Sequence, residues 1–578
     1  MEIGRMKHRI TAKNLPEELI QNELERLKSD RIIERIWARD HTVWNENPDE
    51  ISNRLGWLYS HRSMRENLES IYELGEQVRA EGYTRALLLG MGGSSMAPEV
   101  FRKVFGVRHG YLDLDVLDST DPGAVLDKEN WIEPQKTLFI VSTKSGGTVE
   151  TISLMKYFYN TALKTGGDEG AGKHFIAVTD PGSGLEKTAK EQQFRKIFLN
   201  DPDIGGRYSA LSFFGLAPAG LIGTDLERLI DNADAMACNA EAVNCPIERE
   251  NTPAWLGCAL GALGKSGRDK VTLVLSPPVE PFGAWIEQLI AESTGKEGKG
   301  LLPVVGETLT APEYYANDRL FVYFRLKDDT TYDQKIAILR EAGYPVIQLN
   351  LQDKYSLGGE FFRWMMATAI AGWTMGINPF DQPDVESAKI QARGMVSAYR
   401  EKGALPSVNP DLTVGAIKVY SGSGADDLQQ VWREFSKKAV SGVNESKGRS
   451  YFAIQAYLKP GKETDRALQG WRDKIQTRFR AAVTVGYGPR YLHSTGQLHK
   501  GDGGNGMFIQ LTADATRDIP IPEQPGEDRT SISFGVLEKA QALGDRQALL
   551  DAGRQVIRFH LGNDITGSIK KLSGAITK

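Results

Sequence analysis

The sequence predicts an α/β protein with two doubly wound parallel-sheet domains and a further α/β region at its C-terminal end. Short apolar runs of strand length alternate with stretches of helical periodicity along most of the chain. Two of these runs end in glycine-rich turns, at Met91–Ser94 and Ser142–Thr148. Such strand-to-helix turns lie at the edge of a parallel sheet where ligands bind. The composition, 40% hydrophobic and 25% charged, is that of a globular protein.

Size, charge and cysteine usage narrow the class of protein. The 578 residues are enough for about three to four domains. The net charge of −5 comes without a basic run, which argues against nucleic acid and membrane surfaces as partners. The apolar stretches are too short for a membrane span, and residues 1–14 lack the apolar core of a signal peptide. We expect a cytoplasmic protein, because its cysteines lack Cys-x-x-Cys spacing and are typical of a reducing compartment: Cys238, Cys245 and Cys258.

Residues 1–80 are predicted to form an N-terminal helical extension. We expect it to pack on the first sheet and to carry no chemistry of its own. Its helical periodicity covers four stretches: 15–28, 30–37, 49–59 and 64–79.

The first sheet domain is predicted over residues 81–224, with a phosphate-binding loop as its main feature. The stretch 141–151 combines hydroxyl side chains and Lys144 with two glycines, directly before a predicted helix. Converging N–H and hydroxyl donors at a helix N-terminus suit a phosphate, although a solvated loop with a Ser/Thr cap is the alternative. The P-loop spacing is absent. Predicted strands are 85–90, 114–118, 137–141, 175–179 and 196–199.

Arg207 closes this first domain in the segment Gly205-Gly206-Arg207-Tyr208-Ser209. An arginine at such a position is most often a partner in a surface salt bridge. Beside a phosphate loop, its guanidinium could instead stabilise an oxyanion.

The second sheet domain is predicted over residues 225–400. A helix over 281–291 continues into Glu292, and Gln288 and Glu292 are four residues apart, so both project from one helical face. A solvated polar stripe is the alternative for this pair. A long apolar helix over 359–376 is predicted to be buried. Predicted strands are 270–276, 301–305, 320–325 and 345–350.

Residues 401–578 are predicted to form a C-terminal α/β region. Its long glycine-rich loop over 487–504 holds His493 and His499, two of only eight histidines. Long polar loops in compact domains are often functional, although single histidines are more often structural. Predicted strands are 416–420, 451–457, 481–485 and 507–512, and predicted helices are 426–438 and 465–479.

Taken together, five segments resemble the glucose-6-phosphate isomerase family of the sugar-isomerase (SIS) superfamily. The resemblance spans residues 87–389, and the last third looks most like the isomerase half of bacterial transaldolase–isomerase fusions, without room for a transaldolase barrel. It implies that the two sheet domains are of SIS type. The matching segments are Gly90–Ser94, Thr143–Thr151, Gly205–Ser209, Gln288–Lys296 and Asn378–Lys389.

The resemblance implies an intramolecular aldose–ketose isomerase that interconverts glucose 6-phosphate and fructose 6-phosphate through a cis-enediol, without metal or cofactor. Glu292 would be the base that moves a proton between C1 and C2, and a carboxylate within reach suits that task. Arg207 would stabilise the enediolate. Gln288 would orient Glu292 or a sugar hydroxyl, and Lys389 would assist ring opening. The phosphate would be held by Ser94, Thr143, Lys144, Ser145 and Thr148.

The sequence departs from the family pattern at the ring-opening histidine, since residues 293–388 contain none. Our hypothesis is that His493 or His499 replaces it, from the same chain or from a dimer mate. Gly496-Gln497-Leu498-His499 loosely echoes the family's Gly-Gln-His segment, which favours His499. At Gly147, where many relatives carry threonine, a backbone N–H is expected to replace one phosphate hydroxyl.

Two alternatives stay open at this point. A dual-specificity phosphoglucose/phosphomannose isomerase would differ in its handling of C2 stereochemistry, and Gln288 favours the strict glucose enzyme because dual-specificity relatives often carry threonine there. A non-catalytic SIS protein that senses a sugar phosphate would need the phosphate loops but not Glu292, Arg207 and Lys389 together. The resemblance also implies a homodimer with shared sites.

Overall fold

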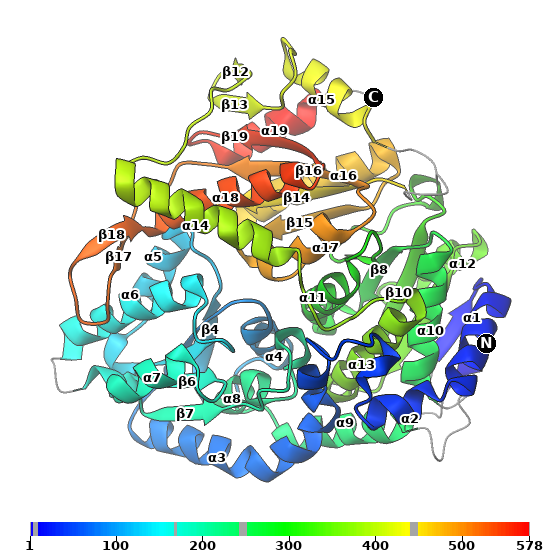
Figure 1. Cartoon of the computed structure of the whole chain (residues 1–578), viewed down its shortest axis with the longest axis horizontal. Helices are drawn as coiled ribbons and strands as arrows, with labels where there is room; N and C mark the ends of the chain where they lie inside the picture. Colours follow the sequence, from blue (N-terminus) through cyan, green and yellow to red (C-terminus); the bar gives the residue numbers. More distant parts are fainter. Residues whose placement is uncertain (1, 4–9, 167–169, 242–250, 440–448, 577–578) are drawn as a thin grey trace.

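The computed structural model describes residues 2–3, 10–166, 170–241, 251–439 and 449–576. Three sheets built around parallel strands, each flanked by helices, make up the molecule (Figure 1). The predicted α/β class is therefore confirmed. The domain boundaries after residues 80, 224 and 400 stay a prediction. Cys245 lies outside the described residues, whereas Cys238 is an exposed and Cys258 a buried free thiol.

The first sheet has the strand order β4-β3-β5-β6-β7, with all neighbours parallel. The chain runs from β3 to one side and from β5 to the other, so the carboxyl ends of these two adjacent strands form a topological switch point. The two glycine-rich turns follow β3 and β5, as the sequence predicts. The strands are β3 (Arg85–Gly90), β4 (Asp113–Leu117), β5 (Thr137–Ser142), β6 (Phe175–Thr179) and β7 (Lys196–Leu199).

The second sheet has the order β1-β2-β11-β10-β8-β9. Its central strands are parallel, and the N-terminal strands β1 and β2 extend it in antiparallel fashion. The start of the N-terminal segment thus extends the second sheet, whereas it was expected to pack on the first. The later part does pack on the first unit, where α3 (Ser60–Ala80) contacts α8 (Phe213–Leu221). The strands are β1 (Glu2–Ile3), β2 (Ile10–Lys13), β8 (Lys270–Leu275), β9 (Leu302–Val304), β10 (Arg319–Leu326) and β11 (Val346–Leu351).

The C-terminal region also contains a mainly parallel sheet, in the order β12-β13-β19-β16-β14-β15. Figure 1 shows this region, coloured yellow to red, across the top of the other two sheet units. The strands are β12 (Leu412–Val414), β13 (Ile417–Tyr420), β14 (Tyr451–Tyr457), β15 (Val483–Tyr487), β16 (Gly506–Thr512) and β19 (Gln555–His560), with a separate hairpin of β17 (Pro520–Pro522) and β18 (Thr530–Ser533).

The helices cover the sheet faces and bury one another. All residues of α13 are buried, as its apolar sequence predicts. It packs on α10 at Gly257, where a Cβ atom would lie only 2.7 Å from the carbonyl oxygen of Ala367. Among the described residues, no helix has the length and apolar character to cross a bilayer. In the N-terminal half and second unit the helices are α1 (Glu17–Ser29), α2 (Ile32–Trp37), α3 (Ser60–Ala80), α4 (Met96–Phe105), α5 (Pro122–Trp131), α6 (Val149–Gly166), α7 (Gly184–Glu191), α8 (Phe213–Leu221), α9 (Leu226–Ala240), α10 (Thr252–Lys265), α11 (Phe282–Thr294), α12 (Asp333–Glu341) and α13 (Leu357–Met375).

The C-terminal helices bring distant segments to the other two units. The α14 helix packs along α18, and α17 lies against α11. The residues 49–59, predicted as a helix, form short 3-10 turns instead, at Ser52–Arg54 and Gly56–Tyr59. The remaining helices are α14 (Val385–Lys402), α15 (Leu428–Ser436), α16 (Lys462–Phe479), α17 (Gly496–Gly501), α18 (Phe534–Asp551) and α19 (Ile565–Ala575).

Candidate active site

A cleft of about 460 Å³ lies where the three sheet units meet. Its walls come from the turns after β3 and β5, from α11, from the start of α14 and from the loop after β15. Every site residue predicted from the sequence lines this cleft except His499. These residues are Ser94, Thr143, Lys144, Ser145, Thr148, Arg207, Gln288, Glu292, Lys389 and His493.

Glycines allow the turns at the switch point to pack closely. Gly92 has a φ of 55°, a conformation that favours glycine, and a Cβ on Gly93 would lie 1.9 Å from the carbonyl oxygen of Gly206. This contact brings the turn after β3 against the segment that carries Arg207. Gly146 has a φ of 68°, and its Cβ would lie 2.4 Å from the amide nitrogen of Leu185. The backbone of both turns is therefore fixed by packing.

The polar groups of the turn after β5 face the cleft at the N-terminus of α6. The hydroxyls of Thr143 and Thr148 form a 2.9 Å hydrogen bond across the turn. Lys144 forms an ion pair with Asp180 and donates a 2.8 Å hydrogen bond to the carbonyl of Pro202. The N–H of Gly147, expected to face a phosphate, donates to the Ser145 hydroxyl at 3.3 Å. Hydroxyls, an ammonium and a helix N-terminus thus converge here, as anion binding requires.

Arg207 is buried and held in one orientation, which rules out the surface salt bridge. Its Nε donates to the Ser293 hydroxyl at 2.7 Å, and its Nη2 donates to the carbonyls of Pro379 and Asp381 at 2.7 and 3.0 Å. Its Nη1 donates to Gln382 Oε1 at 2.9 Å and lies 3.3 Å from Glu292 Oε1. Only 3% of the side chain is exposed. The guanidinium is a fixed positive charge at the cleft wall.

Glu292 presents its carboxylate to the cleft from the C-terminal part of α11. Gln288, one turn earlier, donates from Nε2 to Glu292 Oε2 at 3.2 Å. The same amide donates to the backbone carbonyl of His493 at 2.8 Å. With Arg207 on the other oxygen, the carboxylate is held from two sides and still 14% exposed. It is oriented, partly desolvated and reachable, as a general base must be.

Lys296 adds a second buried cation behind Arg207. Its ammonium donates to both the carbonyl and the side-chain Oδ1 of Asp381 at 2.6 Å. Burial, together with the nearby positive charge of Arg207, lowers the pKa of Lys296 to about 8. Asp381 is therefore held by two cations, Arg207 at its carbonyl and Lys296 at its carbonyl and carboxylate.

His493 reaches the cleft from the loop after β15 and pairs with a buried carboxylate. Its Nε2 lies 3.0 Å from Glu150 Oε1. Because a carboxylate only accepts hydrogen bonds, Nε2 carries the hydrogen, and Nδ1 makes no hydrogen bond to any described residue. Burial alone would raise the pKa of Glu150, but the charge and hydrogen bond of His493 outweigh it and lower that pKa. The pair is an acid–base unit at the rim of the cleft.

Lys389 lines the cleft from α14, and its side chain is partly exposed. Lys389 stands near the start of α14 with 47% of its side chain exposed, and its ammonium lies 3.7 Å from the Glu386 carboxylate. The start of α14 is held by Gln497, whose Oε1 accepts from the amides of Asp384 and Val385 at 2.9 and 3.2 Å. The loop that contains Gln497 therefore positions the helix that carries Lys389.

His499 lies outside the cleft, whereas His493 lines it, so the geometry favours His493 over the preferred His499. It is 2% exposed, packs among the rings of Tyr491 and Phe508, and lies 3.3 Å from the Gln455 amide nitrogen. Burial and the neighbouring Lys500 hold its pKa well below the usual value. The likeness to a family segment pointed to the loop that reaches the cleft, but the ring that lines the cleft is that of His493.

Four residues in or behind the cleft wall were not predicted from the sequence. Glu150 lies inside a quoted segment and could have been suspected as a buried carboxylate near the phosphate turn. Gln382 and Ser293 also lie in quoted segments, and both hold Arg207. Arg54 lines the cleft from the N-terminal extension, which was expected to carry no chemistry. Nothing in its sequence neighbourhood indicates this position.

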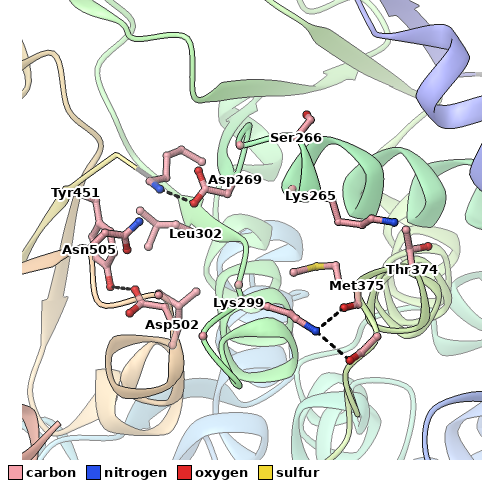
Figure 2. A pocket seen from close by; sticks show the side chains of 18 of the residues that line it. Lys265, Ser266, Asp269, Lys299, Leu302, Thr374, Met375, Tyr451, Asp502 and Asn505 are labelled. Carbon is pink, nitrogen blue, oxygen red and sulfur yellow. Dashed lines mark hydrogen bonds and ion pairs between the residues drawn. The ribbon is translucent and has the colours of Figure 1, made fainter. Parts of the chain in front are cut away.

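A larger cleft of about 770 Å³ lies at the amino ends of β8, β14 and β16 (Figure 2). Two of its lysines are held by neighbouring groups. Lys270 pairs with Asp269 at 2.6 Å, and Lys299 donates to the carbonyls of Met375 and Gly376 at 2.9 and 3.3 Å. None of the predicted site residues lines it. The smaller cleft, which Glu292, Arg207, His493 and the phosphate turns line, is therefore the candidate active site.

In the part of the chain that the structure describes, no group of three or more His, Cys, Asp or Glu side chains is placed to hold a metal ion.

Comparison with known proteins points to one family. The profile of the family described as phosphoglucose isomerase matches residues 40–302. A probable glucose-6-phosphate isomerase of Methanococcus maripaludis is 29% identical over 383 residues, 59% of this chain and 84% of that protein. A glucose-6-phosphate isomerase of Rubrobacter xylanophilus is 29% identical over 375 residues, 56% of this chain and 85% of that protein. The crystal structure of a glucose-6-phosphate isomerase from Chlamydia trachomatis superimposes with a TM-score of 0.59 at 18% identity, over 69% of this chain and 90% of that one, and so shares the fold.

Proposed function

The chain belongs to the phosphoglucose isomerase family, and we propose that its cleft interconverts D-glucose 6-phosphate and D-fructose 6-phosphate, a step of glycolysis and gluconeogenesis. It is an intramolecular aldose–ketose isomerase. The observation that carries the site assignment is the Glu292 carboxylate, held between Arg207 and Gln288 in one cleft with the phosphate turns.

Substrate binding begins at the phosphate turns in this proposal. The hydroxyls of Thr143, Ser145 and Thr148, with Ser94 and the Lys144 ammonium, hold the phosphate at the N-terminus of α6. This anchoring fixes the rest of the sugar over α11, and such fixation lowers the entropy cost of every later proton transfer.

Ring opening is assigned to His493 and Lys389. The C1–O5 bond breaks as the protonated His493 ring gives its Nδ1 proton to O5, while the proton of the O1 hydroxyl passes to water and the C1 aldehyde forms. The Lys389 ammonium stabilises the negative charge that develops on the sugar oxygens. Glu150 stabilises the charged imidazole, since opposite charges at hydrogen-bond distance favour the ionised forms. The free Nδ1 is the nitrogen available to the sugar.

Isomerisation is assigned to Glu292 and Arg207. Glu292 takes the proton from C2 of the open aldose, and the electron pair moves through the C1–C2 bond to O1. Arg207 stabilises the enediolate charge, a preorganised interaction that typically contributes about 2.7–4 kcal/mol. The proton then returns to C1 while the O2 proton moves to O1, which yields the ketose.

The test of this function is a turnover assay with fructose 6-phosphate. Glucose 6-phosphate formation is followed through NADPH from an added dehydrogenase, for the parent and for Glu292→Gln. We expect fast turnover in the parent and a loss of about a thousandfold or more in the variant. A parent that binds the sugar phosphate without turning it over would instead be a sensing protein.

We also propose a cytoplasmic homodimer: the location rests on the cysteine usage, and the dimer rests on the family resemblance alone. Light scattering of the purified chain tests the oligomeric state, with a mass near 128 kDa expected from two chains of 63.8 kDa. Because His493 and Glu292 line one cleft of a single chain, the specific activity is expected to stay constant on dilution. Activity that falls in step with dimer dissociation would show that the partner completes the site.

A further inference from the structure

The carboxylate behind His493 is held from its other side by a residue of the C-terminal region. Gln541, on α18, donates from Nε2 to Glu150 Oε1 at 2.6 Å. The amide of Gln541 is itself oriented, because its Oε1 accepts a 2.8 Å hydrogen bond from the hydroxyl of Thr120. The result is a chain of hydrogen bonds that runs from Thr120 through Gln541 and Glu150 to His493.

Every inner member of this chain is buried. Thr120 is fully buried, and Gln541 and Glu150 are each 4% exposed. A buried carboxylate without donors would be costly, and fixed donors determine where its charge points. Glu150 Oε1 receives two of them, the Gln541 amide and the His493 ring N–H, so the two are linked through one oxygen.

The same helix also supports the second ring-opening residue. At Gly544, one turn after Gln541, α18 approaches α14 so closely that a Cβ would lie 2.7 Å from the amide nitrogen of Ala392 and 3.2 Å from the carbonyl of Ala388. Ala388 directly precedes Lys389. The α18 helix therefore contacts both Glu150, which pairs with His493, and the part of α14 that carries Lys389.

We propose that Gln541 is a positioning residue for ring opening: its amide holds the Glu150 carboxylate so that His493 presents Nδ1 to the ring oxygen. This inference rests on the proposed isomerase function and deepens it. Gln541 does not touch the substrate, because it does not line the cleft. Its effect passes through Glu150.

The test separates ring opening from isomerisation. An enzyme that opens the ring speeds the interconversion of the α and β anomers of glucose 6-phosphate, which NMR exchange measures without any transfer between C1 and C2. Gln541→Leu is expected to slow anomer interconversion about ten- to a hundredfold, the usual effect of losing a hydrogen bond to a buried charge. The KM for fructose 6-phosphate is expected to stay within about twofold, since the phosphate turns are untouched.

The pH dependence of kcat separates a positioning role from a general structural defect, because a structural defect would not shift it along the pH axis. A donor to the ionised carboxylate lowers its pKa, so removal of the Gln541 amide is expected to move the acid limb of kcat toward neutral pH. Thr120→Val should shift the limb in the same direction by less, because it frees the Gln541 amide without removing it. This second variant keeps the proposal testable if Gln541→Leu folds poorly.

Gln510→Leu is the matched control. Gln510 is fully buried, donates to the carbonyl of Ala542 on the same helix, and has no contact with Glu150. It should leave anomer interconversion and the pH limb unchanged. An active parent whose Gln541→Leu and Thr120→Val variants match it, or a Gln510→Leu variant that is equally slow, would overturn the role of Gln541 alone. A parent without isomerase activity would overturn the proposed function, and this inference with it.

Discussion

Arg207 shows how single side chains are fixed before any substrate arrives. Its guanidinium makes four donor contacts to the Ser293 hydroxyl, two backbone carbonyls and Gln382, so its charge cannot turn away from Glu292. The planar fork of an arginine suits this array, whereas a lysine offers one compact charge. The orientation is therefore a property of the residue type and of its neighbours together.

Arg207→Lys tests this reading. We expect kcat to fall about a hundredfold to a thousandfold, as when one preorganised donor to an oxyanion is lost, with little change in KM. Initial rates with fructose 6-phosphate measure both constants. A variant with normal kcat and a raised KM would mean that Arg207 binds the ground state, not the enediolate.

The two histidines of the C-terminal loop give a second prediction. His493→Ala should slow anomer interconversion about a hundredfold to ten-thousandfold, the range for loss of a general acid. His499→Ala should leave that rate in place and lower the thermal midpoint, because it empties a buried position among aromatic rings. NMR exchange and a thermal melt of both variants decide. Loss of activity only in His499→Ala would reverse the assignment.

At the scale of elements, local patterns predicted most of what forms the phosphate half of the site. The turns after β3 and β5 were predictable because strand, glycine-rich turn and helix follow one another in sequence. Gln288 and Glu292 were predictable as a pair because helix geometry places positions four apart on one face. Strand β2 and the 3-10 turns over 52–59 were missed, because their form depends on contacts with distant segments.

The helix α11 carries a further carboxyl whose protonation is coupled to stability. Burial raises the pKa of Glu287 to about 7, although Arg490 and Arg472 work against this. The folded chain thus keeps this proton up to about pH 7, while the unfolded chain releases it near the ordinary value of 4.5. Between these two values the folded state binds more protons, so the stability from this group falls as the pH rises.

Glu287→Gln should remove that pH dependence. We expect the parent to lose about 1–2 kcal/mol more stability than the variant between pH 5 and pH 7.5, and nothing further above it. Thermal midpoints of both proteins across this range make the comparison. Equal slopes would mean that Glu287 ionises normally in the folded chain.

At the scale of the whole molecule, three sheet units build one cleft. The first unit supplies the phosphate turns and Glu150, the second supplies Glu292 with Gln288, and the C-terminal region supplies His493 and Gln541. The sequence indicated a functional loop over 487–504, but only long-range packing decides which ring points at Glu150. His493 and His499 are six residues apart, and the α17 helix, which carries His499, turns the second ring into the C-terminal core.

The central claim is that Glu292 moves the proton while the C-terminal region opens the ring. The measurement that tests it most directly is NMR of glucose 6-phosphate in deuterated water, with the parent enzyme and with Glu292→Gln. The parent should interconvert the anomers and incorporate deuterium at C2. The variant should still interconvert the anomers but exchange deuterium at C2 at least about a thousandfold more slowly. Exchange at the parent's rate in Glu292→Gln would contradict the account.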